Sequence, residues 1–264
     1  MDRNALSANV LGLIPGGDPE VADELVVYTA HHDHMGVAKP DEDGDAVYNG
    51  ARDNASGCAT IMSVAKAFAT LPAPARRSIL ILLVGAEEQG LLGSKWYAQN
   101  PTVHPGKIAA NINIDSAAIF GRARDVAVIG KGKSRLEDLL VQAAAMQDRI
   151  VVDEPFPDKG YYYRSDQFNF AKIGVPALYF KAGTDSVEHG DAWGREIEDR
   201  WRAERYHQPG DEIYDEWDFG GMVEDARLAF WVGLHVANAD EPPGWMPGDE
   251  FEAVRERALA EVAD

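Results

Sequence analysis

The sequence predicts an α/β protein, a three-layer sandwich with a central, mostly parallel mixed sheet. Two observations carry this prediction. Several short runs are apolar at every position, as is typical of strands buried on both faces of a largely parallel sheet. Segments with apolar residues at helical spacing lie between these runs, and strands that alternate with helices favour helices on both faces of one sheet. At 264 residues, the chain is long enough for a single domain of this kind.

The predicted elements follow in order along the chain. The strands are the short apolar runs, at residues 9–14, 25–28, 79–84, 112–114, 126–129 and 177–180. The helices are the segments whose apolar residues recur every three or four positions, at residues 55–70, 134–147 and 221–237.

The remaining segments complete the predicted organisation. Residues 9–14 are interpreted as a core strand, although they lie close to the start of the chain. Residues 185–204, rich in His, Glu, Arg and Trp, are interpreted as a long loop near the site. One domain is expected over residues 1–240, followed by a charged C-terminal tail or helix over residues 241–264.

Composition excludes several classes of partner. The chain carries 44 acidic and 25 basic residues, a formal charge of −19, and no local basic patch, so binding to nucleic acid or to an anionic membrane is not expected. The chain contains no run of 18 apolar residues, so no membrane-spanning helix is predicted. No signal peptide is visible. The single cysteine, Cys58, cannot form an internal disulfide, which leaves the redox compartment open.

Three predicted strands end in side chains that can bind metal. His31 follows the strand at 25–28, Glu87 and Glu88 follow the strand at 79–84, and Asp115 follows the strand at 112–114. Functional sites in open α/β sheets form just beyond the carboxyl ends of the strands. These side chains are therefore expected at one edge of the sheet.

Two further segments complete a set of metal ligands. Asp53 lies in a loop that leads into a helix, and His207 lies in the segment 205–212. Two imidazoles and three carboxylates suit a pair of zinc ions, because one carboxylate can bridge ions about 3.5–4 Å apart. A further carboxylate must stay off the metal to take a proton from water, and the adjacent Glu87 and Glu88 can divide these roles.

Each of these signals is also compatible with an ordinary structural role. A Glu-Glu pair is usually a solvated turn, Asp53-Asn54 before Ala-Ser-Gly is a helix N-cap, and Tyr206-His207 before Gln-Pro is a turn. The metal-site hypothesis depends on these signals occurring together, because five separate segments each offer a ligand type and three of them lie at the expected sheet edge.

The motifs together resemble a known family. The order His-x-Asp, Asp-Asn-x-Ser-Gly, Glu-Glu-x-Gly-x-x-Gly-Ser, Asn-x-Asp and Tyr-His-x-Pro-x-Asp is similar to the co-catalytic di-zinc aminopeptidases related to aminopeptidase Y and glutamate carboxypeptidase. The resemblance runs over residues 9–238, and residues 86–94 match it especially closely. It implies a zinc-exopeptidase-like (phosphorylase/hydrolase-like) fold, with residues 1–240 as the catalytic domain.

The resemblance also implies the metal ligands. Each chain would bind two zinc ions, with His31 and Asp115 on one ion, Glu88 and His207 on the other, and Asp53 as the bridge. The other five histidines are predicted to have no metal role: His32, His34, His104, His189 and His235.

Further roles follow from the same resemblance. Glu87 would be the general base, and Tyr206 would hydrogen-bond the oxyanion of the tetrahedral intermediate. Asp33 would support His31 from behind, and Arg164 would contact substrate carbonyl or carboxylate groups, with a structural salt bridge as the alternative for Arg164. A cis peptide bond is expected after Asp53, as is common in the family.

The activity implied is hydrolysis of the N-terminal residue of peptides with a free N-terminus, through hydroxide held by two zinc ions. The alternatives are another activity of the clan (carboxypeptidase, dipeptidase or single-zinc glutaminyl cyclase), a peptidase-like binding domain without catalysis, and a fragment that is poorly active alone. Related proteins are often periplasmic or secreted, but nothing in this chain directs export. The first-residue preference, the native metal and the oligomeric state stay open.

The chain departs from the family pattern in two respects. Arg52 stands where relatives often carry an acid. Relatives usually have a helix before the first strand, and many carry an inserted protease-associated domain, for which too few residues precede Asn9. One edge of the sandwich is therefore expected to be uncovered, with dimerisation as one means of compensation.

Overall fold

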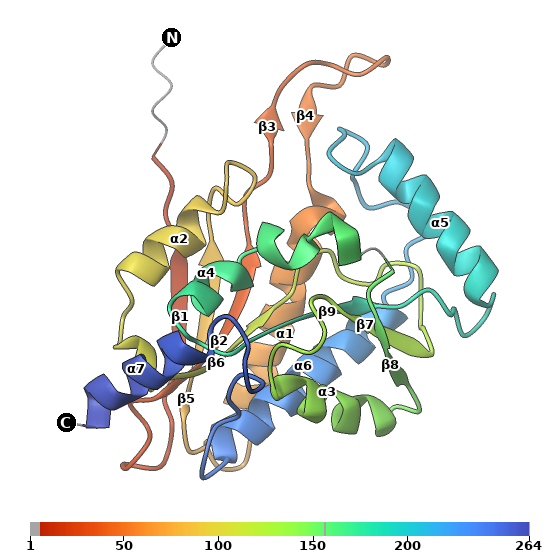
Figure 1. Ribbon diagram of the computed structural model, residues 1–264. Coiled ribbons are helices and arrows are strands. Elements are labelled where there is room, and N and C mark those ends of the chain that lie inside the picture. Colours follow the sequence, from red (N-terminus) through yellow and green to blue (C-terminus); the bar gives the residue numbers. More distant parts are fainter. Residues whose placement is uncertain (1–5, 156, 264) are drawn as a thin grey trace.

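A seven-stranded mixed sheet forms the centre of the protein in a computed structural model that describes residues 6–155 and 157–263 (Figure 1). Its strands stand in the order β1-β5-β2-β6-β9-β7-β8. They are β1 (Val10–Ile14), β2 (Leu25–His31), β5 (Ser78–Val84), β6 (Ile108–Asn113), β7 (Asp125–Val128), β8 (Ile150–Asp153) and β9 (Ala177–Ala182). A separate hairpin pairs β3 (Gly36–Val37) with β4 (Val47–Tyr48).

The sheet is mostly parallel. β2 pairs in parallel with both β5 and β6, β6 pairs in parallel with β9, and β7 with β8. Only β1 against β5 and β7 against β9 are antiparallel. The predicted mostly parallel mixed sheet is therefore confirmed.

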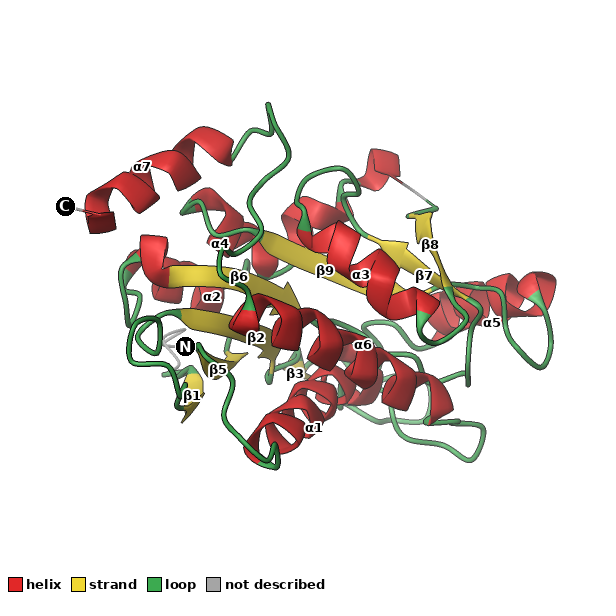
Figure 2. Cartoon of the chain, turned by 90° about the horizontal axis from the view of Figure 1, so that it is seen from below, coloured by secondary structure: helices red, strands yellow, loops and turns green. Residues whose placement is uncertain are grey.

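Helices cover both faces of this sheet (Figures 1 and 2). The helices are α1 (Gly57–Ala69), α2 (Leu92–Gln99), α3 (Leu136–Ala145), α4 (Gln167–Lys172), α5 (Asp191–Glu204), α6 (Gly220–Asn238) and α7 (Glu252–Ala263). α1, α3 and α6 form one layer, and α2 and α4 lie on the opposite face with α7 beside them, whereas α5 lies at the end of the sheet near β7 and β8. This arrangement confirms the three-layer sandwich.

The alternating faces of the central strands account for these layers. Along β2, Val26 and Tyr28 pack among the residues of α1 and α6, whereas Leu25 and Val27 point to the other face. There they meet Tyr97 of α2 and Phe170 of α4. A strand buried on both faces needs apolar residues at every position, which is why the sequence signal is a continuous run.

A close contact between the sheet and its helical layer involves Tyr28. Its hydroxyl donates a hydrogen bond of 2.8 Å to the carbonyl oxygen of Ala229 in α6. A Cβ atom at Gly233 would lie 1.7 Å from that hydroxyl, so only glycine fits there. The pair holds α6 close to the middle of the sheet.

Two expectations from the sequence are wrong. Residues 9–14 do not form a core strand, because β1 is an antiparallel edge strand whose side chains are mainly exposed. Residues 185–204 are not a long loop, because α5 occupies most of that segment. The signal for this helix was present: Trp193, Ile197 and Trp201 recur every four residues and form one face.

The ends of the chain add two findings. The side chains of Val10, Leu11 and Leu13 are exposed on β1. Residues 252–263 of the predicted C-terminal tail or helix form α7. Residues 1–5 of the predicted domain and Asp264 lie outside the described residues. No helix in the described part of the chain has the length and apolarity needed to cross a bilayer.

Candidate metal centre

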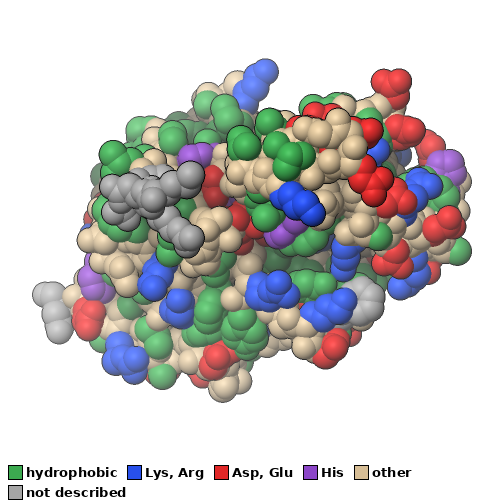
Figure 3. Space-filling model, turned by 90° about the horizontal axis from the view of Figure 1, so that it is seen from above, with side chains coloured by type: hydrophobic (Ala, Val, Ile, Leu, Met, Phe, Trp, Pro, Cys, Tyr) green, Lys and Arg blue, Asp and Glu red, His purple; other side chains and the backbone are tan. Residues whose placement is uncertain are grey.

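The predicted ligands do meet at one edge of the sheet. β5, β2 and β6 are neighbours, and β2 is parallel to both, so their carboxyl ends lie together. His31 ends β2, while Glu88 and Asp115 follow the ends of β5 and β6. Figure 3 looks onto this face and shows a histidine side chain near its centre.

One group of ligands surrounds His31. Its Nε2 atom lies 3.1 Å from Oδ1 of Asp53 and 3.7 Å from Oδ1 of Asp115. His31 and Asp53 are buried, and Asp115 is nearly so. Nitrogen and oxygen atoms at such separations can coordinate one ion in common, since zinc takes both at about 2.0–2.2 Å.

A second group surrounds His207. Its Nε2 atom lies 3.2 Å from Oε2 of Glu88 and 3.3 Å from Oδ2 of Asp53. The two oxygens of Asp53 thus face different histidines, Oδ1 toward His31 and Oδ2 toward His207. Asp53 therefore lies between the two histidines.

The turn that carries Asp53 is held from below by Asp211. The backbone amides of Arg52 and Asp53 donate hydrogen bonds to its two carboxylate oxygens, at 3.1 and 3.0 Å. Asp211 is completely buried, and its backbone carbonyl accepts a further bond from Ala51. The peptide bond between Asp53 and Asn54 is cis, as the resemblance implied.

Asn54 and Ser165 tie this turn and Asp115 to their surroundings. Asn54 donates a hydrogen bond from Nδ2 to the carbonyl oxygen of Ile114 and accepts one at Oδ1 from the amide of Ser116. The hydroxyl of Ser165 donates a bond of 2.7 Å to Oδ2 of Asp115, leaving Oδ1 directed at His31. These bonds fix the first group of ligands before any ion binds.

Glu87 lies beside these side chains and forms no ion pair with any residue that the structure describes. One of its oxygens lies in a group with ligand atoms of His31 and Glu88, all within 4.8 Å of one another. Burial raises the pKa of Glu87 to about 9, and the negative charge of Asp115 adds to this rise. A half-buried carboxyl of this kind can exchange a proton with a neighbouring water.

Asp33 supports both His31 and Glu87. Its backbone carbonyl oxygen lies 3.0 Å from Nδ1 of His31, whereas its carboxylate is 4.0 Å away. The carboxylate instead accepts a hydrogen bond of 3.2 Å from the amide of Glu87. The predicted support of His31 is therefore made mainly through the backbone, and the side chain positions the segment that carries Glu87.

Tyr206 and Arg164 are both exposed. The ring of Tyr206 stacks on His207 with centroids 3.8 Å apart, and burial raises the pKa of its hydroxyl. Arg164 is exposed, with its guanidinium 5.9 Å from the ring of Tyr161. No salt bridge of Arg164 is found among the described residues, although that was the alternative interpretation.

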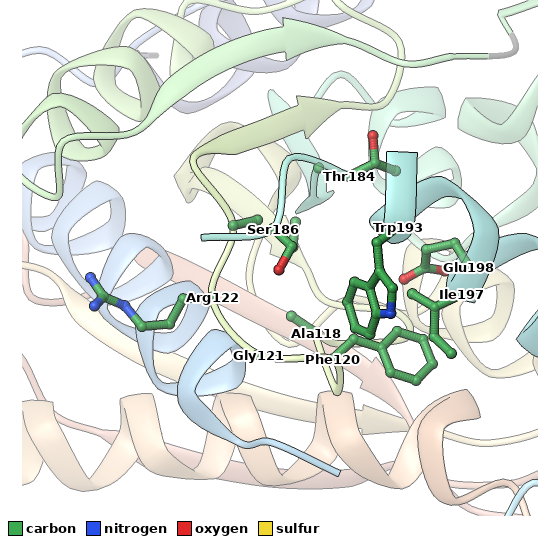
Figure 4. Close-up of a pocket in the computed structure, with 13 residues that line it drawn as sticks. Ala118, Phe120, Gly121, Arg122, Thr184, Ser186, Trp193, Ile197 and Glu198 are labelled. Carbon is green, nitrogen blue, oxygen red and sulfur yellow. The ribbon is translucent and has the colours of Figure 1, made fainter. Parts of the chain in front are cut away.

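The sequence analysis missed the contacts of Arg52. Its guanidinium donates two hydrogen bonds, of 3.0 and 2.6 Å, to Glu198 of α5, and it lies over the rings of Trp201 and Phe120. Figure 4 shows Glu198 with Trp193 and Ile197 of α5 beside the segment that carries Phe120. Arg52 thus ties α5, which leads directly to Tyr206 and His207, to the turn that carries Asp53.

His34 is one of the five histidines for which the sequence analysis predicted no metal role. Its side chain is only 5% exposed, and Nδ1 lies 2.8 Å from Oε1 of Glu88. In the sequence, the only feature that pointed to His34 was its position three residues after His31. His34 lies in the segment that leads into the hairpin β3–β4, and the sequence does not determine which way its side chain points.

The ionisable groups of the site shift one another's pKa values. Burial alone would raise the pKa of Glu88, but the imidazoles of His207 and His34 lower it to about 2. Burial lowers the pKa of His207, but Asp53 and Glu88 reverse that effect and raise it to about 10. Protons therefore neutralise the cluster when no cation is bound. An N/O donor set that demands positive charge fits zinc.

We expect the metal-free protein to lose stability as the pH rises from about 7 to 9. The pKa of His207 is raised from 6.5 to about 10, and that of Glu87 from 4.5 to about 9. In this range the folded chain holds more protons than the unfolded chain, so the free energy of unfolding falls with pH. Melting temperatures of the chelator-treated, metal-free protein between pH 6 and 9.5 check this prediction. We expect the melting temperature to fall by several degrees.

The zinc-loaded protein is the control for this experiment. Bound ions displace the protons, so its melting temperature should change less over the same range. A metal-free protein whose melting temperature rises between pH 7 and 9 would contradict the proton assignment.

The fold and the site define the class of the protein: an α/β sandwich that gathers two imidazoles and three carboxylates, side chains able to bind divalent metal, at the carboxyl edge of its sheet. The sequence profile of peptidase family M28 matches residues 9–229. Because this match spans most of the chain, the protein belongs to peptidase family M28.

The chain is also similar to individual proteins and solved structures. The chain is 24% identical to aminopeptidase YwaD of Bacillus subtilis (strain 168) over 212 residues, covering 79% of this chain and 43% of the relative. The structure of BSAP, a zinc aminopeptidase from Bacillus subtilis, superposes with a TM-score of 0.63 at 22% identity, covering 88% of this chain and 50% of that one. Porphyromonas gingivalis glutaminyl cyclase gives 0.58 at 17% identity, covering 85% and 76%. The chain thus spans about half the length of the aminopeptidase relatives it matches.

Proposed function

We propose that the protein is a zinc-dependent aminopeptidase that removes the first residue from peptides with a free N-terminus. The observation that carries the proposal is the arrangement of Asp53 between His31 and His207, with Glu87 beside the group. Membership of family M28 and similarity to proteins named as aminopeptidases support it.

The proposed ligand set has two parts. His31 and Asp115 would hold one zinc ion, Glu88 and His207 the other, and Asp53 both. Zinc bound there would polarise the scissile carbonyl group and lower the pKa of a water molecule. The site lies in a negative, half-buried cluster, which also suits the positive α-amino group of a peptide.

The other residues would manage the proton and the developing charge. Glu87 would take a proton from the attacking water and deliver it to the leaving amine. Its pKa of about 9 applies without metal, and nearby cations would lower it toward a working range. The hydroxyl of Tyr206 would donate a hydrogen bond to the oxyanion, since its raised pKa keeps it protonated. Arg164 would contact substrate carbonyl or carboxylate groups.

The test is metal content per chain together with hydrolysis of a leucyl chromogenic amide before and after chelation. We expect two zinc ions per chain, with activity that a chelator abolishes and zinc restores. Dilution into zinc-free buffer without chelator serves as the control for slow loss of activity.

Other results would favour other functions. One zinc per chain with no amide hydrolysis would favour a glutaminyl cyclase, which N-terminal glutaminyl peptides would then test. Release of C-terminal residues would indicate a carboxypeptidase. Absence of both metal and hydrolysis would contradict the proposal and favour a binding domain.

A further inference from the structure

His34 is a buried imidazole that lies against Glu88 without an aligned hydrogen bond. Its side chain is 5% exposed, and neither ring nitrogen makes a hydrogen bond among the described residues. Oε1 of Glu88, which lies 2.8 Å from Nδ1, is likewise without a hydrogen bond. Buried polar atoms are nearly always paired, so an unpaired nitrogen and an unpaired oxygen side by side require a physical cause.

The position of the ring is built into the fold. The ring of His34 meets the ring of His207 edge-on, with centroids 5.6 Å apart and planes at 71°. On its other side lies Gly50, where a Cβ atom would be 2.6 Å from Cγ of His34 and 2.5 Å from the carbonyl oxygen of Asp53. Gly50 also has a φ of +66°, which favours glycine. The segment before Asp53 therefore leaves room for this ring and holds it toward the ligands.

The geometry is that of two ligands rather than of a hydrogen-bonded pair. A nitrogen and an oxygen at 2.8 Å without hydrogen-bond alignment can both point at one cation. His34, Asp53 and Glu88 each offer one atom, and these atoms lie within 4.8 Å of one another. Nε2 of His207 lies 3.3 Å from Asp53 and 3.2 Å from Glu88, so it faces the same two carboxylates.

We propose that His34 is an additional protein ligand of the second metal position, beside Glu88, His207 and Asp53. This inference rests on the proposed metal-dependent function and refines its metal site. The two positions are then unequal. The first has three protein ligands, His31, Asp53 and Asp115, whereas the second has four.

This inequality has a functional consequence. Zinc with four protein ligands is typical of closed, structural sites, and zinc with three keeps a position open for water or substrate. The open position would therefore lie at the first ion, next to Glu87, and the second ion would be the more tightly held of the two.

The experiment compares zinc binding by the wild-type protein, His34→Gln and the control His32→Gln, using equilibrium dialysis and calorimetry. His32 is exposed and lies in the same loop, where its ring bonds only the carbonyl oxygen of Ala8 among the described residues. We expect the wild type and His32→Gln to bind two ions. His34→Gln should bind the first ion normally and the second about 100-fold more weakly or worse, beyond the 10–100-fold typical of lost indirect support.

A second measurement does not depend on a variant. In ¹⁵N-histidine-labelled wild-type protein, zinc should shift the ring-nitrogen resonances of three histidines, those of His31, His34 and His207. A shift of only two, or a second ion bound equally well by His34→Gln, would overturn the proposal. If the wild type binds no zinc at all, the proposed function fails together with the role of His34. If the wild type binds zinc and only the results for His34 differ from those expected, the role of His34 fails alone.

Discussion

Replacement of Glu87 by Gln should lower the turnover of a leucyl amide by about 100-fold or more, the range expected for a lost general base. The amide cannot accept a proton from water, but it has nearly the same shape. Glu87 lies beside His31 and Glu88 without occupying the position between His31 and His207, so the metal content should stay at two ions per chain. The measurement is kcat together with metal content for the wild type and Glu87→Gln.

Glu88→Gln is the matched comparison. The residues are adjacent, but Glu88 lies 3.2 Å from Nε2 of His207, so its substitution should weaken metal binding as well as turnover. Exposed Glu42→Gln should change neither. Near-wild-type turnover by Glu87→Gln would remove Glu87 from the mechanism.

Replacement of Asp53 by Asn should weaken the binding of both ions. A neutral amide has one oxygen, whereas the Asp53 carboxylate directs one oxygen at each histidine. Even loss of an indirect partner of a ligand typically costs 10–100-fold in metal affinity, so loss of a shared ligand should cost about 100-fold or more. Zinc titration by calorimetry would measure both affinities.

The outcome separates a bridge from a ligand of one ion. Loss of affinity for a single ion would show that Asp53 serves only one position. The exposed Asp240→Asn is a suitable control, because in the described part of the chain Asp240 pairs only with Arg76, which precedes the start of β5. A folded Asp53→Asn protein that binds two ions normally would contradict the bridging assignment.

Much of the fold was readable from the sequence. The strands buried on both faces, β2, β5, β6 and β9, are continuous apolar runs, and short runs of this kind are typical of central strands in a parallel sheet. The edge strand β1 has a similar composition but lies exposed. Composition cannot distinguish a central from an edge strand, because that difference depends on which strands pair. The helix α5 was missed because its many charged residues hid the face formed by Trp193, Ile197 and Trp201.

The candidate site was partly readable for a different reason. Strand ends determine where His31, Glu88 and Asp115 lie, since parallel neighbours end at the same edge. The ligand roles of Asp53 and His207 were implied by the family resemblance. Only the folded chain shows how far their side-chain atoms lie from the other ligands. The roles of Arg52 and Asp211 depend on contacts across more than 140 residues of sequence, Arg52 to Glu198 and Asp211 to Arg52, which no local pattern encodes.

Local sequence was enough to establish the α/β class, the order of the motifs and the chemical types of the ligands, because apolar periodicity and residue type are local properties. Three features required the folded chain: Asp53 lies between two histidines, Arg52 joins α5 to the turn of Asp53, and His34 rather than His32 points at Glu88. His32 and His34 lie in one loop, and the sequence alone does not distinguish them. Their burial and direction depend on what packs against them, here Gly50 and His207 around His34.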